Sequence, residues 1–389
     1  MIRKRLIEME NSATDEDTGW RKKKGKTNSE GVTIEGKRPH RRLKMIGAAA
    51  AVAGPPVTFK ILANRLRKKP DREAGENIRE PLGETAHYLE REDGARLYVE
   101  ELGKGPTMIL VHGWFCNTDS WHYQKKNLQD CYRVISYDQR GHRWSESADG
   151  KPVTIDNLAE DLKAIIDAKA PDEPVVLVGH SMGGMSILKL TETYPELLGD
   201  RVKGVALVDT SHVKLTSCLA GGSVISKIEK PVVEPLFRWI TEHHWFADRV
   251  KRTMVGTAPF LVATRYLGYG SNAPLTMLEY ISDMASETSM KGAMQAGLAL
   301  LGDSAEVSLD PLRESGIPVM IWVGEKDKLT RPEVSEAMAR ELPGSMLYVV
   351  EDTGHPSYME EYKRFNEVLD SFARESFGIP VEEEAEAAE

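Results

Sequence analysis

Residues 175–184 read VVLVGHSMGG, an uninterrupted apolar run followed by the pattern G-x-S-x-G. The branched apolar residues at the start are typical of a strand that is covered on both faces. The residues that follow, from Met182 to Tyr194, repeat their apolar side chains at helical spacing. The chain must therefore reverse sharply at Ser181, and the glycines at 179 and 183 leave room for that reversal. This stretch predicts a strand–turn–helix unit with a serine hydroxyl exposed at its apex.

The chain from residue 86 onward alternates similar apolar runs with amphipathic stretches. A hairpin is predicted at His87–Glu90 and Arg96–Glu101, around the turn residues Asp93-Gly94. Six further strands are predicted at Met108–Val111, Tyr132–Tyr137, Val175–Val178, Val202–Val208, Val319–Val323 and Met346–Val350, and helices at Leu158–Ala168, Met182–Tyr194, Pro332–Leu342 and Tyr358–Phe372. This alternation predicts an α/β fold for residues 86–376, with a mostly parallel central sheet and flanking helices.

One long interval contains no predicted strand. Between the sixth and seventh predicted strands, residues 212–314 show only helical patterns, around Val233–Met254, Pro259–Leu267, Thr276–Ala285 and Lys291–Leu301. We expect a helical cap here. The interval is rich in aromatic residues: Phe237, Trp239, Trp245, Phe246, Phe260, Tyr266 and Tyr269. Aromatic residues at helical spacing form ordinary core more often than a ligand wall, so core packing is the favoured interpretation.

The composition excludes several classes of protein. Of the 389 residues, 41% are hydrophobic and 29% charged, which is enough to build a sizeable core and excludes a wholly disordered chain. Residues 1–72 contain 19 Lys and Arg against 8 Asp and Glu, so the remainder carries a net charge of −20. An acidic body argues against a nucleic acid partner, because phosphate binding needs basic groups on the folded surface. The three cysteines show no CxxC spacing, and the sequence predicts no metal site and no cofactor.

The two ends of the chain differ from its body. Residues 1–44 are basic and poor in apolar side chains, which predicts a disordered tail, and residues 377–389 form an acidic tail. Residues 45–69 join an Ala-rich stretch, which includes an A-x-A cleavage pattern at 51–53, to a stretch with Phe59, Leu62 and Leu66 on one helical face among basic residues. We predict a signal peptide or membrane anchor, with residues 41–69 meeting an anionic membrane. A chance apolar patch in the tail of a cytoplasmic protein is the alternative.

Ser181 is the predicted nucleophile. The turn leaves its hydroxyl free, and the helix that follows presents N–H groups to any negative charge that develops there. A serine alone is a weak nucleophile and needs a base that a third group orients. His355 is the predicted base, because it follows the strand Met346–Val350 and no other histidine follows His244. Functional groups gather at the carboxyl ends of parallel strands, so His355 is expected at the same sheet edge as Ser181.

The third member of this set is predicted in the loop after Val319–Val323, which reads Gly324-Glu325-Lys326-Asp327. We favour Asp327 as the acid that orients the imidazole. Glu325, two residues earlier, and Asp209, at the end of the preceding strand, are its rivals. All three follow the carboxyl end of a predicted strand, so position along the chain leaves the choice open.

Acyl transfer also needs hydrogen-bond donors for the oxyanion of the tetrahedral intermediate. The backbone N–H of Met182, the residue after the serine, is the first predicted donor. The second is predicted in the loop after Met108–Val111, which reads His112-Gly113-Trp114-Phe115. Gly113 allows the backbone to approach closely, and the N–H of Trp114 is the preferred donor, with that of Phe115 as the alternative.

Five motifs together resemble the α/β-hydrolase superfamily: HGW at 112–114, DQRGHRWS at 138–145, GHSMGG at 179–184, GEKDKLT at 324–330 and GH at 354–355. The resemblance covers residues 86–376 and is closest to the esterase, lipase and cofactor-free haloperoxidase-like branch. It is also similar to uncharacterised actinobacterial hydrolases with an N-terminal anchor. It implies the α/β-hydrolase fold and the chain order serine, acid, histidine. Where the pattern D-x-R-G-H-G-x-S has its second glycine, this chain has Arg143, which a positive φ would strain.

These features favour a serine hydrolase that cleaves a carboxylic ester or acyl lipid through an acyl-enzyme. The apolar residues of the cap indicate a small apolar ester or acyl substrate. A perhydrolase or haloperoxidase-like activity, or another acyl hydrolase such as a thioesterase or amidase, is the alternative on the same three residues. A non-catalytic scaffold with a hydrolase shell is the alternative from another class. The presence of Ser181, Asp327 and His355 in the expected order argues against it.

Overall fold

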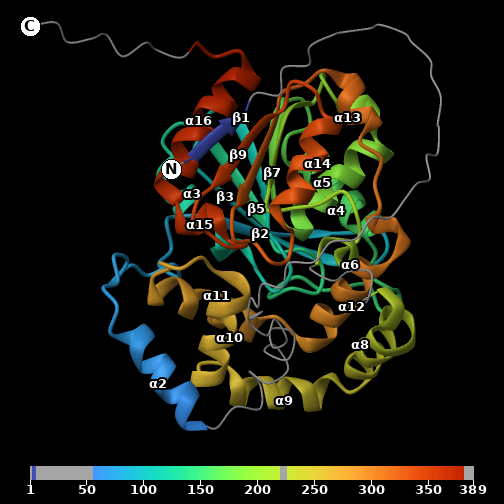
Figure 1. The fold of residues 1–389 in the computed structure, drawn as a ribbon. Coiled ribbons are helices and arrows are strands. Elements are labelled where there is room, and N and C mark those ends of the chain that lie inside the picture. The colour runs from blue at the N-terminus through green and yellow to red at the C-terminus, as the bar shows by residue number, and fades with distance from the viewer. Residues whose placement is uncertain (1, 6–55, 220–225, 381–389) are drawn as a thin grey trace, which may run out of the picture.

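The computed structural model describes residues 2–5, 56–219 and 226–380. In this part of the chain nine strands form one sheet in the order β1-β9-β8-β7-β6-β4-β5-β3-β2 (Figure 1). Their bounds are β1 (Ile2–Arg5), β2 (Thr85–Glu90), β3 (Arg96–Leu102), β4 (Thr107–Val111), β5 (Arg133–Tyr137), β6 (Val175–His180), β7 (Val202–Val208), β8 (Val319–Gly324) and β9 (Met346–Val350). Strands β4 to β9 run parallel, whereas β1, β2 and β3 pair in antiparallel fashion. The predicted α/β class and mostly parallel sheet are confirmed.

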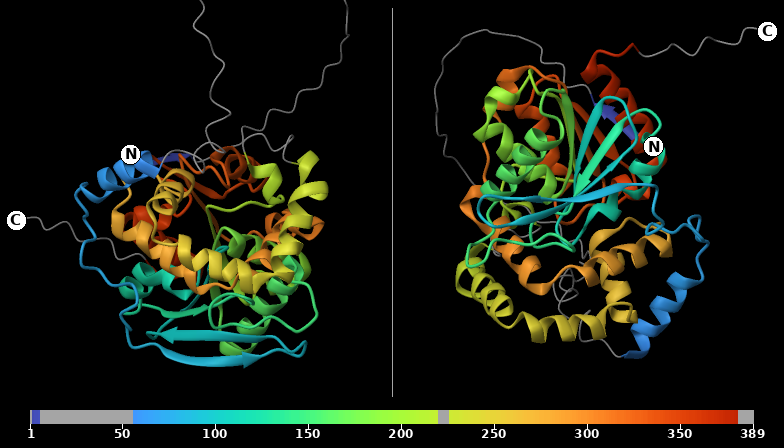
Figure 2. Two further views of the ribbon diagram at one scale, coloured as in Figure 1. Left: turned by 90° about the horizontal axis from the view of Figure 1, so that it is seen from below. Right: turned by 180° about the vertical axis from the view of Figure 1, so that it is seen from behind.

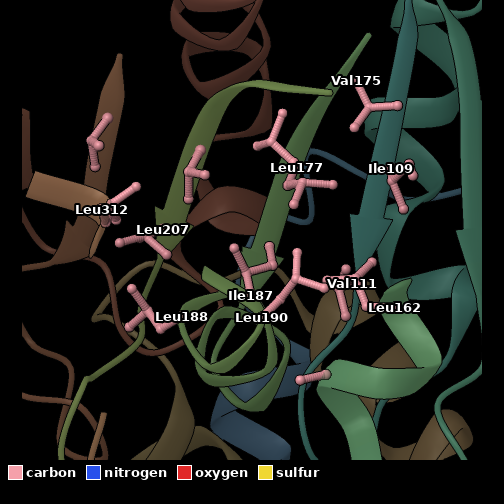
Figure 3. Close-up of a cluster of buried hydrophobic side chains, with 14 of the residues drawn as sticks. Ile109, Val111, Leu162, Val175, Leu177, Ile187, Leu188, Leu190, Leu207 and Leu312 are labelled. Atoms are coloured by element: carbon pink, nitrogen blue, oxygen red, sulfur yellow. The ribbon is translucent and has the colours of Figure 1, made fainter. Parts of the chain in front are cut away.

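Side chains of the central strands alternate between two apolar layers. In β6, Val175 and Leu177 face one layer, and Val176 and Val178 face the other. The first layer is covered by α4 (Ile155–Lys169), α5 (Met182–Thr193), α13 (Asp310–Ser315) and α14 (Pro332–Glu341), and part of it is drawn in Figure 3. The second is covered by α3 (His122–Leu128), α15 (Ser357–Glu360) and α16 (Tyr362–Phe377). Burial on both faces explains why these strands read as continuous apolar runs.

The predicted cap lies between β7 and β8, over the end of the sheet where Ser181 follows β6 (Figures 1 and 2). Its helices are α6 (Leu215–Cys218), α8 (Glu234–Glu242), α9 (His244–Met254), α10 (Ala258–Gly268), α11 (Leu275–Glu287) and α12 (Met290–Leu301). Its boundary differs from the expected 212–314, because α13 packs Leu312 into the apolar layer beside the sheet. The cap therefore ends before Asp310.

The predicted disordered tail at 1–44 is wrong at its start. Strand β1 pairs with β9, with Ile2 opposite Val350 and Arg5 opposite Leu347. The edge of a sheet leaves backbone N–H and C=O groups unpaired, and an extended segment can bond to them whatever its side chains are. Residues 6–55, which include the rest of this tail and the Ala-rich stretch, lie outside the described residues, as do 381–389.

The amphipathic stretch after Pro56 forms α2 (Pro56–Arg67), which packs against the cap helix α10. Phe59 and Ala63 are buried against Val262, so part of the predicted apolar face is used inside the molecule. Ile61 and Leu62 remain exposed. Within the described ranges, no helix combines the length and the apolar character that crossing a membrane requires.

Candidate active site

Ser181 stands between β6 and α5 in a strained backbone conformation, with φ 52° and ψ −119°. The glycines on either side are needed for close packing. A Cβ at Gly179 would lie 2.6 Å from the Gly184 nitrogen, and a Cβ at Gly183 would lie 2.1 Å from the Val111 oxygen. The predicted strand–turn–helix unit is thus present, and its sharp reversal depends on glycine at both positions.

The structure brings Ser181, His355 and Asp327 together from three loops. The His355 Nε2 atom lies 2.9 Å from Ser181 Oγ, and its Nδ1 atom lies 2.8 Å from Asp327 Oδ2. This geometry fits a neutral ring that donates its Nδ1–H to Asp327 and accepts the serine hydroxyl at Nε2. Asp327 also accepts the backbone N–H groups of Leu329 and Thr330, at 2.8 and 3.0 Å. These bonds hold the carboxylate in place behind the imidazole.

The two rival acids are placed elsewhere. Glu325 is exposed and accepts the backbone N–H of Asp352. Asp209 is buried and accepts N–H groups of Gly324 and Ser357 together with the Ser357 hydroxyl. Burial, followed by the nearby Asp327 carboxylate, raises the pKa of Asp209 well above its usual range. Asp209 therefore braces the loops that carry Asp327 and His355, a role that its position at a strand end did not reveal.

The two segments that carry the predicted oxyanion donors both adjoin Ser181. Met182 is the first residue of α5, where the N–H groups of a helix lack partners within it. The loop after β4 presses against the serine, since a Cβ at Gly113 would lie 3.0 Å from the Ser181 Cβ atom. Among the described residues, no backbone hydrogen bond occupies the N–H of Trp114 or of Phe115. Both candidates for the second donor thus remain available for an oxyanion.

An apolar cavity of about 570 Å³ lies between these residues and the cap. Its lining includes His355 and Phe115 from the sheet side and Trp239, Phe246 and Phe260 from the cap. The favoured expectation of core packing is wrong for these three aromatic residues. For Trp239 and Phe246 the physical reason is that α8 and α9 bury no residue completely, so their apolar faces border a hollow instead of a second layer, whereas Phe260 lies on α10, which buries its neighbours Leu261 and Val262 instead.

Arg143 occupies a backbone conformation that suits glycine, with φ 41°. Its guanidinium is nearly buried, lies 2.9 Å from Asp119 Oδ1 and 3.3 Å from Glu287 Oε2, and stacks on Trp144. Glu287 ends the cap helix α11. The arginine therefore connects a loop of the sheet to the cap, and these contacts offset the strain that the sequence predicted.

Replacement of Arg143 by glycine sets these two effects against each other. Relief of the positive φ contributes about 1 kcal/mol, but the loss of a buried ion pair costs about 3–5 kcal/mol. We therefore expect Arg143→Gly to lower the free energy of unfolding by about 2–4 kcal/mol in urea titrations. Arg143→Lys, which keeps the charge and the strain, should lose less. A glycine variant as stable as the wild type would contradict this account.

Glu360 is a buried carboxyl that the sequence did not single out. It accepts the backbone N–H of Gly354 at 2.7 Å and that of Gly270 at 3.1 Å. Gly354 precedes the predicted base, and Gly270 lies between the cap helices α10 and α11. The backbone N–H of His355 also donates to the Gly268 oxygen, at 2.6 Å. One carboxyl thus fastens the histidine loop to the cap, and burial raises its pKa to about 7.

This raised pKa predicts a pH dependence of stability. Between pH 4.5, the usual pKa, and about 7 the folded protein keeps the Glu360 proton that the unfolded chain releases. The contribution of Glu360 to the free energy of unfolding should therefore fall by about 3 kcal/mol as the pH rises through this window. Denaturation of wild type and Glu360→Gln at pH 5 and pH 8 measures it, because the variant lacks the ionisation. Glu361→Gln is the control. An equal pH dependence of stability in all three proteins would rule out the raised pKa of Glu360 as its cause.

Comparisons with known proteins agree with this architecture. An esterase of Thermogutta terrifontis, solved with malate bound, is 26% identical with a TM-score of 0.60, over 75% of this chain and 99% of its own. The pimeloyl-[acyl-carrier protein] methyl ester esterase of Nitrosospira multiformis is 24% identical over 72% of this chain and 98% of its own. An uncharacterized protein of Mycobacterium tuberculosis is 25% identical over 72% and 78%. The model of the alpha/beta hydrolase family matches residues 108–368. The resemblance and the fold predicted from the motifs are thereby confirmed, and the chain belongs to the alpha/beta hydrolase family.

Proposed function

We propose that this protein is a serine hydrolase that cleaves carboxylic esters through an acyl-enzyme intermediate. The observation that carries the proposal is the position of the His355 ring, 2.9 Å from the Ser181 hydroxyl and 2.8 Å from the Asp327 carboxylate. An imidazole held in this way can accept a proton from the serine and return it to a leaving group. The names of the Thermogutta and Nitrosospira relatives, both esterases, support an ester substrate.

The reaction follows from these positions in two halves. His355 Nε2 removes the proton as Ser181 Oγ attacks the ester carbonyl, and Asp327 stabilises the imidazolium that forms. The N–H groups of Met182 and Trp114 then bind the oxyanion. Collapse breaks the bond to the alcohol, which leaves with the proton from His355. Water, deprotonated by the same imidazole, attacks the acyl-enzyme and releases the acid.

Labelling with a fluorophosphonate probe tests this mechanism directly. The probe forms a covalent bond with an activated serine, so the wild-type chain should label at Ser181, and peptide mapping should locate the adduct there. A Ser181→Ala variant with unchanged circular dichroism should not label. Absence of labelling in the folded wild-type chain would favour a non-catalytic scaffold.

The apolar cavity predicts a preference for longer acyl chains. Each methylene that leaves water contributes about 0.8 kcal/mol, so kcat/KM should rise by up to about fourfold per methylene across p-nitrophenyl esters from acetate to octanoate. Ala285 lines the cavity. Ala285→Trp should fill it and penalise octanoate while sparing acetate. A flat profile in the wild type would contradict an acyl-binding role for the cavity.

A further inference from the structure

Exposed apolar side chains gather on one surface of the cap. Of fourteen large apolar side chains exposed in the described residues, all but Tyr88 and Trp144 lie on α2, on α8 to α10 or just before α8. They are Ile61, Leu62, Ile228, Val232, Leu236, Trp239, Trp245, Phe246, Val250, Met254, Tyr266 and Leu267, and we call them the cap surface. In Figures 1 and 2 the helices α2, α10, α9 and α8 lie in a row at the side of the molecule farthest from the sheet. A patch of this kind marks a surface that meets something apolar.

The cavity lined by His355 opens onto this surface. Five residues of the cap surface also line the cavity: Trp239, Phe246, Val250, Met254 and Leu267. Their chain neighbours Trp245 and Tyr266 do not line it and are the most exposed, at 67% and 63%. The mouth of the cavity is therefore bordered by two amphipathic aromatic side chains that face outward. Tryptophan and tyrosine are the residues that favour the interface between lipid and water.

The charge of this region is opposite to that of the rest of the body. Residues 56–70 contain Lys60, Arg65, Arg67, Lys68 and Lys69 and no acidic residue. Residues 226–268 contain seven basic residues against four acidic ones, although residues 73–389 as a whole carry a net charge of −20. Basic groups beside an exposed apolar surface match the anionic headgroups of a bilayer. Two copies that met through this same surface would instead bring like charges together.

We propose that the cap surface docks onto an anionic lipid membrane, and that the ester substrate passes from the bilayer directly into the cavity. The docking stands on the surface alone, whereas the passage of substrate rests on the proposed esterase function. Helices α2, α9 and α10 lie on the membrane and do not cross it, with Trp245 and Tyr266 at the level of the headgroups. The rate of hydrolysis of an ester should then depend on whether the ester is dissolved in a bilayer as well as on its chemical structure.

Co-sedimentation of the full chain with vesicles tests the docking. The wild type should bind vesicles of phosphatidylcholine mixed with phosphatidylglycerol and bind those of phosphatidylcholine alone more weakly. Trp245→Ser combined with Tyr266→Ser should lower the partition coefficient by about tenfold or more. Lys60→Glu combined with Arg249→Glu should do the same at low salt and have less effect at high salt. Tyr88→Ser and Lys104→Glu, which change exposed residues of β2 and of the loop after β3, outside the cap surface, are the matched controls and should bind as the wild type does.

Activity measurements separate the two parts of the proposal. Both surface variants should hydrolyse soluble p-nitrophenyl acetate at the wild-type rate and lose activity only on an ester carried in anionic vesicles. Binding without any hydrolysis would uphold docking and overturn the passage of substrate. Equal binding by wild type, surface variants and controls would overturn the docking. The docking would also be overturned if the wild-type chain did not bind vesicles and instead formed a dimer that dissociated in the Trp245→Ser variant. That result would assign the surface to self-association.

Discussion

Ser181→Ala is expected to lower kcat for ester hydrolysis by about a millionfold while the protein remains folded. Among the described residues, the imidazole of His355 is the only side chain that hydrogen-bonds to the Ser181 hydroxyl, so removal of the hydroxyl deletes the nucleophile and leaves a single ring nitrogen without its partner. Residual catalysis by the oxyanion donors and the cavity should still exceed the rate in water by about a thousandfold.

Steady-state kinetics on p-nitrophenyl butyrate, with thermal unfolding as the check on folding, measure this effect. Ser186→Ala is a matched control, because Ser186 lies one turn further along α5 and bonds to Gln139 and to the Met182 oxygen, away from the imidazole. Retention of a tenth or more of the activity by the Ser181 variant would exclude the proposed nucleophile.

Asp327→Asn is expected to lower kcat by about ten-thousandfold. Asparagine has the same shape, but its amide would present N–H groups where His355 Nδ1 now donates to Oδ2 across 2.8 Å. The ring would then turn or change tautomer, and its Nε2 could no longer accept the serine proton. The loss should appear in kcat and much less in the KM for a small ester.

Glu325→Gln provides the comparison, because it removes an exposed carboxylate two residues away that does not contact His355. We expect this variant to keep the wild-type rate. A large loss in the glutamine variant together with a small loss in the asparagine variant would reverse the assignment of the acid.

The positions of Ser181 and His355 could be predicted because each depends on a rule that acts locally. A glycine-flanked serine between strand and helix has one way to turn, and residues after parallel strands share one sheet edge. The choice of Asp327 over Asp209 needed more than that rule, since both follow strands. Their hydrogen-bond partners distinguish the two residues. Asp327 lies 2.8 Å from the His355 imidazole, whereas Asp209 accepts the backbone N–H groups of Ser357 and Gly324.

Other features depend on pairings between distant segments and left no signal in the sequence. The sequence around Glu360 gives no indication that its carboxyl accepts a hydrogen bond from Gly270, ninety residues away, because any buried backbone N–H could have donated to it. The aromatic residues of α8 and α9 follow the same spacing whether they face a core or a hollow. Strand β1 pairs with β9 through backbone groups. Such pairing requires no particular residue types, so the sequence of residues 2–5 does not predict it.

The bonds from Glu360 and His355 to residues 268–270 divide the cap into two parts with different freedom. The segment between α10 and α11 cannot swing outward without pulling His355 away from Ser181, so we expect it to stay in place when a ligand binds. Among the described residues, helices α8 and α9 bury no residue completely and make no hydrogen bond to His355, and α9 is held by Asp248 and Lys251 to the connection between α11 and α12. Entry and exit of a ligand should therefore depend on motion of α8 and α9, while residues 268–270 stay in place beside His355.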